Sequence, residues 1–185
     1  MNATKSKQIH LQMSLYCAFF AALMVVGGYI AIPIGPVPIV LTDFFIMCTG
    51  LFLGAKYGAM SCALYLLLGS IGLPVFAGGN GGFGAFFGPT GGFLLGYLPM
   101  AALVGWISSR RKDSILLSFC GLVLGNIVLY AIGIPLLYYN AHLKSWAAAF
   151  SAGLIPFIPG LCAKIALAAT LKKLLYARLQ RLMNR

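Results

Sequence analysis

The chain has 185 residues, of which 61% are hydrophobic and 8% are charged, and its formal net charge is +11. A soluble domain carries roughly a quarter charged residues, so this composition excludes an ordinary water-soluble fold and indicates an integral membrane protein. The positive charge requires no nucleic-acid partner, because anionic lipid headgroups attract basic segments beside a membrane.

Six apolar stretches are predicted to be transmembrane helices because each approaches the length that crosses a bilayer. The first is too long for the core of a cleavable signal peptide. A shorter apolar stretch at 146–155 precedes the sixth. We expect an all-α integral membrane protein, with residues 1–185 forming a single six-helix transmembrane domain. In chain order the predicted spans cover residues 11–33, 39–54, 57–74, 90–109, 114–138 and 157–178.

Basic residues gather on one side of this topology. Eleven of the 13 Lys and Arg residues lie before the first span, near 56, at 110–112, or toward the C-terminus. The positive-inside rule therefore predicts cytoplasmic N and C termini, in a multi-pass protein of the inner (cytoplasmic) membrane. Asp113, which follows three basic residues, is expected to cap a helix or to pair with a neighbouring charge.

The three connections on the opposite side are rich in glycine and proline and cover residues 31–39, 75–97 and 134–160. Irregular backbone at membrane depth persists only where protein buries it or where it lines a cavity. Glycines such as Gly79 also allow the backbone to approach a ligand closely. We therefore expect these outer loops to cap a ligand cavity, whereas flexible exposed linkers would not alternate glycine with several phenylalanines.

Asp43 and Lys164 are charged residues inside predicted spans, both toward the outer face. A charge in a span costs about 2.5–3.5 kcal/mol on insertion scales and indicates a functional residue with a partner. In one interpretation the two side chains pair only with each other, or Lys164 extends its amine to the outer interface. In the other interpretation they contribute to a ligand site. In the second case Lys164 offers a cation to an acidic ligand and Asp43 accepts hydrogen bonds.

Three further polar residues are candidate ligand contacts. Asn80 lies at the centre of the glycine-rich connection, and Asn126 and Tyr130 lie one turn apart in the fifth span. An amide offers donors and an acceptor together, although intramembrane asparagine also joins helices. No metal site is expected, because His10 and His142 are isolated and the five cysteines form no metal-binding pattern.

Ala18 and Ala22 are four residues apart in the first span and therefore share one helix face. Small residues at this spacing allow another helix to approach, so the pair serves either internal packing or docking of a partner protein.

The chain carries no nucleotide-binding or catalytic motif. This absence favours a binding module over an enzyme; the enzymatic alternative is a lipid-modifying enzyme with Asp43 and Lys164 as its catalytic pair.

The segment Tyr65–Tyr97, "YLLLGSIGLPVFAGGNGGFGAFFGPTGGFLLGY", resembles the signature region of the BioY family. The stretches "PVPIVL" (36–41), "GLFLGAKYGAMS" (50–61) and "PFIPG…K" (156–164) follow in the order and spacing of that family. The resemblance covers nearly the whole chain. It implies the biotin-specific substrate-capture (S) component of an energy-coupling factor transporter, with no enzymatic activity and no cofactor.

The resemblance implies an occluded biotin site below the outer loops, and partners that comprise a transmembrane coupling protein and two ATPase subunits. ATP is then used only by the partner subunits. Ala18 and Ala22 match the small residues with which the family's first helix meets the coupling protein. Lys164 is expected to bind a carboxylate or ureido oxygen, and Asn80 to face the ureido group. The remaining expected ligand contacts are Phe76, Gly79, Phe83, Thr90 and Tyr97, together with Asp43, Asn126 and Tyr130.

One departure from the family concerns the sixth span, where the family commonly has PGDxxK and this chain has "PGLCAK", with Leu161 in place of the acid. Asp43 then stands where an uncharged residue is expected. We interpret this as an acid relocated between helices of one cavity. The alternatives are an S component for another small carboxylate, such as lipoate or a biotin precursor, and a free-standing carrier that works without ATPase partners.

Overall fold

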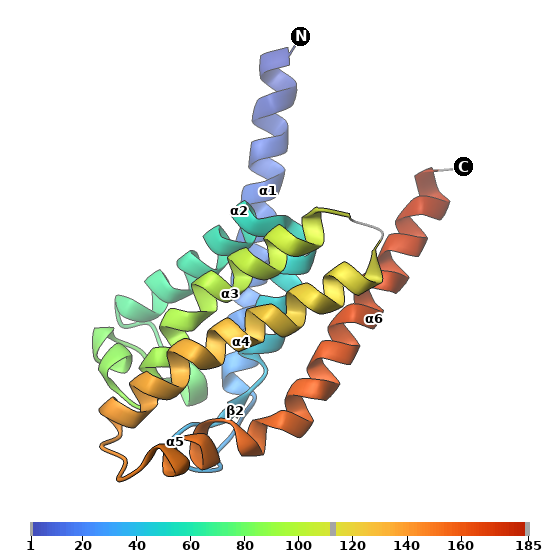
Figure 1. Ribbon diagram of the computed structural model, residues 1–185. Coiled ribbons are helices and arrows are strands. Elements are labelled where there is room, and N and C mark those ends of the chain that lie inside the picture. Colours follow the sequence, from blue (N-terminus) through green and yellow to red (C-terminus); the bar gives the residue numbers. More distant parts are fainter. Residues whose placement is uncertain (1, 112–113, 184–185) are drawn as a thin grey trace.

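The computed structural model describes residues 2–111 and 114–183, so the expected roles of Asp113 lie outside the described residues. The chain is mostly helical, and its long helices pack side by side (Figure 1). The elements are α1 (Asn2–Tyr29), β1 (Ala31–Ile32), β2 (Ile39–Val40), α2 (Thr42–Ser70), the 3₁₀ turns η1 (Ala77–Gly79) and η2 (Phe83–Phe87), α3 (Gly91–Ser109), α4 (Ile115–Asn140), α5 (Trp146–Gly153), η3 (Ile155–Phe157) and α6 (Ile158–Met183).

Five helical stretches among the described residues are long and apolar enough to cross a membrane. A chain with several such stretches is a multi-pass membrane protein. The predicted spans 90–109 and 114–138 agree closely with α3 and α4, whereas 39–54 and 57–74 fall largely within the single helix α2. The five stretches are His10–Tyr29, Thr42–Ser70, Gly91–Ser109, Ile115–Asn140 and Trp146–Leu175.

Helix α2 folds back on itself at Gly54. The backbone there has φ 76° and ψ −176°, a conformation that is open essentially only to glycine. In a straight helix, residues eight apart are separated by about 12 Å, yet a Cβ atom built on Gly58 would lie 3.2 Å from the Gly50 Cα. The segments before and after Gly54 therefore run back beside each other, as the path of α2 in Figure 1 also shows.

Small residues bring the helices close together. A Cβ atom at Gly50 of α2 would lie 2.8 Å from the Ala101 carbonyl oxygen of α3, and one at Gly92 of α3 would lie 2.9 Å from the Gly133 carbonyl oxygen of α4. Lipid gives little hydrophobic drive for helix association, so close backbone packing between small residues is a main source of contact energy in a membrane.

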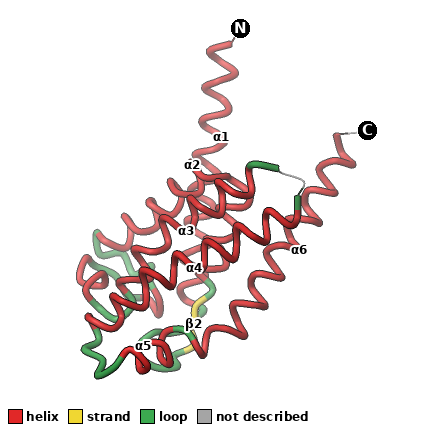
Figure 2. The backbone as a smooth tube through the Cα atoms, in the orientation of Figure 1, coloured by secondary structure: helices red, strands yellow, loops and turns green. Residues whose placement is uncertain are grey.

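The two termini lie at one end of the bundle. Strand β2, helix α5 and the glycine-rich segment between α2 and α3 lie at the other end, which we call the loop end (Figures 1 and 2). The β1–β2 hairpin pairs Ala31 with Val40.

The glycine-rich segment is held by hydrogen bonds. The Gly82 N–H donates to the Gly69 carbonyl of α2 (2.7 Å), and the Asn140 amide of α4 donates to the Gly88 carbonyl (3.0 Å). This segment is therefore a packed part of the structure.

Gly105→Ala tests the packing of α3 against the bend in α2, because a Cβ atom at Gly105 would collide with the backbone of Gly54 and Ala55. Overpacking of this kind costs about 1–3 kcal/mol, so we expect a lower unfolding temperature in detergent. The matched control is Gly160→Ala, where the added Cβ would meet no atom within 4 Å. Equal melting of the Gly105→Ala variant and the wild type would show that the two helices are not in this close contact.

Candidate functional site

A cavity of about 240 Å³ lies at the loop end and is lined by residues of α2, α3, α4, α6 and the loops between them. Its walls are mostly apolar and include a few convergent polar groups, which is the usual form of a small-molecule site. The lining residues are Pro36, Val37, Pro38, Val40, Thr42, Asp43, Tyr65, Phe76, Ala77, Asn80, Ala85, Pro89, Thr90, Phe93, Leu94, Tyr97, Leu129, Tyr130, Phe157 and Lys164.

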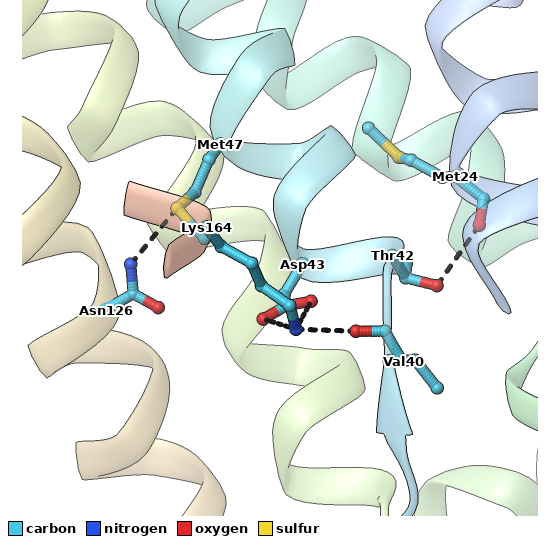
Figure 3. Close-up of polar contacts among 7 residues, drawn as sticks. All are labelled: Met24, Val40, Thr42, Asp43, Met47, Asn126 and Lys164. Carbon is cyan, nitrogen blue, oxygen red and sulfur yellow. Dashed lines mark hydrogen bonds and ion pairs between the residues drawn. The ribbon is translucent and has the colours of Figure 1, made fainter. Parts of the chain in front are cut away.

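An ion pair between Lys164 of α6 and Asp43 of α2 forms part of the cavity wall (Figure 3). The Lys164 ammonium donates to both carboxylate oxygens of Asp43, at 2.8 and 2.9 Å, and to the Val40 carbonyl oxygen at 2.7 Å. Both side chains are only 12% exposed. The pair therefore joins α6 to α2 and to β2 across the cavity.

Asp43 lies in the cavity wall because α2 begins there. Helix α2 begins at Thr42, so Asp43 lies in its first turn, where the exposed backbone N–H groups of a helix favour an acid. The Thr42 hydroxyl donates to the Met24 carbonyl oxygen (3.2 Å) and holds this turn against α1 (Figure 3). Lys164 lies in the second turn of α6, from which its long side chain reaches β2.

Aromatic rings form much of the remaining wall. Phe76 is 2% exposed and packs edge to face on Tyr65, with ring centroids 5.5 Å apart. Phe93 packs in the same way on Tyr130 at 6.0 Å. Offset and edge-to-face pairs of this kind add about 0.5–1.5 kcal/mol beyond simple burial, so the glycine-rich segment and α3 are fixed against the helices that line the cavity.

Seven of the ten residues predicted to contact a ligand line this cavity. They come from four helices and from the glycine-rich segment, and all lie toward the loop end. The sequence-based expectation that Asp43 and Lys164 share one cavity agrees with their geometry. These seven residues are Asp43, Phe76, Asn80, Thr90, Tyr97, Tyr130 and Lys164.

The other three predicted contacts lie elsewhere. Phe83 is 65% exposed and packs on Phe86 and Phe87. Gly79 lies beside the Tyr29 ring, where an added Cβ would be 3.4 Å from a ring carbon. Asn126 is 3% exposed, and none of the three residues is part of the cavity lining.

Asn126 lines a second, almost wholly apolar groove of about 460 Å³ between α4, α5 and α6. Its amide donates to the Leu122 carbonyl oxygen (2.8 Å) and lies 3.5 Å from the Met47 sulfur (Figure 3), while its Oδ1 has no partner among the described residues. Tyr130 lies one turn further along α4 and lines both the cavity and the groove.

Several lining residues give no signal in the sequence. Tyr65 occurs in a long apolar run and gives no signal beyond being a polar aromatic residue in a span. The Val40 carbonyl is a backbone group, and its role depends on where β2 ends. Phe157 and Leu129 look like ordinary apolar residues of a membrane helix, so only the three-dimensional packing reveals their position.

Ala18 and Ala22 are exposed on one side of α1, together with Phe19. The opposite side of α1 packs into the bundle through Ala21 and Met24, which are at most 2% exposed. The small-residue pair therefore does not serve packing within the chain, and its face is open to lipid or to another protein.

Comparisons with known proteins give consistent matches. The model of the BioY family matches residues 2–181. The biotin transporter BioY of Thermotoga maritima is 38% identical over 80% of this chain and 86% of its own length, and that of Rhodobacter capsulatus is 45% identical over 79% and 83%. A crystal structure described as the S-component for biotin from an ECF-type ABC transporter superposes with a TM-score of 0.84 and 32% identity, covering 96% of this chain and 95% of that one.

Lys164→Met tests the ion pair, because it leaves the Asp43 carboxylate buried without its partner. Breaking a buried pair costs about 3–5 kcal/mol, so we expect a marked fall in unfolding temperature in detergent without ligand. The double variant Asp43→Asn/Lys164→Met should be more stable than Lys164→Met alone, since it removes the stranded charge. The control is Lys144→Met, at an exposed lysine. If the losses of stability from the two single substitutions simply add in the double variant, the two residues are not a coupled pair.

Proposed function

The chain belongs to the BioY family, and on this premise we propose that it binds biotin in the cavity at the loop end. It then acts as the substrate-binding component of an energy-coupling factor transporter in the inner membrane. The relatives are transporters and not enzymes, which agrees with the expectation drawn from the absence of catalytic motifs. The resemblance found in the glycine-rich segment is confirmed by the family match.

The observation that carries this proposal is the structural match to the S-component for biotin, because it extends over nearly the whole chain. The cavity supports it chemically. Biotin combines an apolar thioether ring and alkyl chain with a ureido group and a carboxylate. The aromatic lining suits the apolar parts, and the hydrogen-bonding groups of Asp43, Tyr97 and Tyr130 suit the polar ones.

Asp43 takes the part of the acid that the family commonly has in the sixth span. Leu161, at that position, lines the apolar groove and not the cavity, so the expectation that the two positions face one cavity is wrong. Lys164 therefore finds its carboxylate partner on α2. A site with an acid and a lysine is thus retained, with the acid supplied by a different helix.

Six spans and cytoplasmic termini form part of the proposal. The bend at Gly54 supports counting the two parts of α2 as separate spans. The exposed basic residues Lys56, Arg110 and Arg111 belong to the connections nearest the termini, and Arg110 stacks on the Trp106 ring at 4.3 Å. An aromatic residue beside a cation is typical of a membrane–water interface, and the positive-inside rule then assigns this basic end to the cytoplasm and the loop end to the outside.

The exposed small-residue face of α1 is the proposed docking surface for the transmembrane coupling protein, which in turn recruits two ATPase subunits. Ala18 and Ala22 leave room for a partner helix to approach closely. Because the chain supplies no nucleotide-binding motif, transport would draw its energy from these partners.

Isothermal titration of the detergent-purified chain tests the proposed ligand. We expect one equivalent of biotin to bind tightly, and lipoate, which has a carboxylate but no ureido group, to bind far more weakly. Asp43→Asn should weaken biotin binding by roughly tenfold or more, because a hydrogen bond to a charged group contributes about 1.5–3 kcal/mol. Lys144→Gln, at an exposed lysine, should bind like the wild type.

Tighter binding of lipoate than of biotin would assign the cavity to a different carboxylate. Unchanged biotin affinity in Asp43→Asn would refute the proposed role of this acid. Release of a modified product during incubation would instead indicate an enzyme.

Ala22→Phe tests the docking surface, because a large side chain at this exposed position should hold a partner helix away. We expect biotin binding to be unchanged, while copurification with the coupling protein and biotin uptake by cells fall at least severalfold. The matched control is Ala163→Phe, at an exposed alanine of α6. Full uptake by cells that express this chain alone would favour a free-standing carrier.

A further inference from the structure

The apolar groove between α4, α5 and α6 is separate from the loop-end cavity. Its volume of about 460 Å³ exceeds that of the cavity, and Tyr130 is the only described residue that lines both. The floor of the groove is buried, since Ile134 and Ile165 are 4% and 8% exposed, whereas Trp146 and Phe150 at its rim are 47% and 45% exposed. The groove therefore opens on the outside of the bundle, where a multi-pass protein meets the hydrocarbon of the membrane.

The lining restricts the charge and the shape of an occupant. None of the described lining residues is charged, and those of α4 extend from Val123 to Pro135, which is about 18 Å along the helix. A charged group in this groove would be costly, because no opposite charge would pair with it. The groove therefore fits a neutral, elongated molecule with a largely apolar surface.

One polar atom of the groove lining lacks a partner. Asn126 lines the groove and is 3% exposed. Its amide nitrogen donates to the Leu122 carbonyl oxygen at 2.8 Å and lies 3.5 Å from the Met47 sulfur (Figure 3). Turning the amide over would bring two carbonyl oxygens together at Leu122, so Oδ1 is the atom left without a hydrogen bond to the described residues. A buried acceptor without a donor is costly, and this one is accessible only from the groove that Asn126 lines.

The depth of Asn126 limits what can supply the missing donor. Asn126 lies 11 residues after Ile115 and 14 residues before Asn140, the two ends of α4, which is about 16 Å and 21 Å along the helix. It is therefore near the middle of a hydrocarbon core about 30 Å thick. Lipid headgroups do not reach this depth, and acyl chains carry no N–H or O–H group. A donor must therefore be brought into the groove by the occupant itself.

We propose that the groove binds a neutral, single-chain amphiphile that carries one hydroxyl or N–H donor, such as a long-chain alcohol. The hydroxyl donates to Asn126 Oδ1, and the chain follows α4 toward Trp146 and Phe150, whose rings pack on it. The ligand thus satisfies an acceptor that the protein leaves open, while Asn126 satisfies a hydroxyl that the membrane interior would leave unpaired.

Quenching of tryptophan fluorescence by brominated chains tests this site, because only Trp146 of the two tryptophans lines the groove. The full chain is placed in nanodiscs of phosphatidylcholine, a lipid without O–H or N–H donors. Trp106→Phe then reports on Trp146, and Trp146→Phe reports on Trp106, which is 54% exposed. We expect brominated tetradecanol to quench Trp146 saturably, and Trp106 only in proportion to the amount of quencher in the bilayer.

Competition tests the hydrogen bond. Unlabelled tetradecanol should displace the quencher from the groove at a concentration about fivefold or more below that of tetradecane, because one hydrogen bond distinguishes the two molecules. Tetradecanoate, which is charged and has no donor, should compete no better than the alkane.

Two substitutions in the Trp106→Phe background assign the contact. Asn126→Leu keeps the size of the side chain and removes the acceptor, so tetradecanol and tetradecane should displace the quencher equally. Ala131→Phe places a ring in the groove and should abolish saturable quenching. The matched control is Ala163→Phe, at an exposed alanine outside the lining, which should leave it unchanged.

Three results would overturn the proposed site. They are quenching of Trp146 that never saturates, equal displacement by the alcohol and the alkane when Asn126 is present, and a preference for the alcohol that persists in Asn126→Leu. In the second case a trapped water would satisfy Oδ1. None of these measurements involves biotin, so the ligand of the loop-end cavity is decided separately.

Discussion

The Asp43–Lys164 ion pair is the interaction on which the cavity depends. Two opposite charges inside an apolar bundle persist only as partners, because either charge alone would be costly at membrane depth. Here the pair also includes the Val40 carbonyl, so one lysine joins the start of α2, strand β2 and the second turn of α6. The same contact that holds α6 against the rest of the bundle thus forms a polar patch in the wall of a mostly apolar chamber. The pairing of Asp43 with Lys164 explains why this region tolerates charge in a chain with only two acidic residues.

Close backbone packing supplies the remainder of the architecture. The turn at Gly54 returns α2 along itself, and the small residues of α2, α3 and α4 allow these helices to meet at short distances. At the loop end, the same freedom from side chains lets the glycine-rich segment fold down onto α2. The ring of Phe76 packs against Gly69, and the Asn140 amide holds the Gly88 carbonyl. A membrane protein that binds a small molecule needs a roof over its cavity, and bare backbone provides one where bulky side chains would not fit.

The sequence was most informative where a residue conflicted with its surroundings. Asp43 and Lys164 are charges in apolar runs, and for that reason the sequence alone predicts that they share one cavity. The phenylalanines between the glycines indicated packing, yet nothing in the pattern distinguished Phe76, which is buried, from Phe83, which is exposed. Asn126 is predicted to contact a ligand because an amide in a span offers donors and an acceptor, but Asn126 faces the apolar groove and hydrogen-bonds within α4. The Val40 carbonyl could not be predicted at all, since backbone partners depend on where each element begins and ends. The sequence predicts a boundary between spans at Gly54, and the non-helical backbone of this residue, where α2 folds back on itself, agrees with that prediction.

The central claim is that biotin occupies the chamber whose wall contains the Lys164 amine. An experimental structure of the protein loaded with biotin tests it most directly. The account predicts density for biotin in the cavity between α2, α3, α4 and α6, with the Lys164 amine facing the ligand and still bound to Asp43. An empty cavity with biotin bound elsewhere, or a Lys164 side chain turned toward the surrounding lipid, would contradict it.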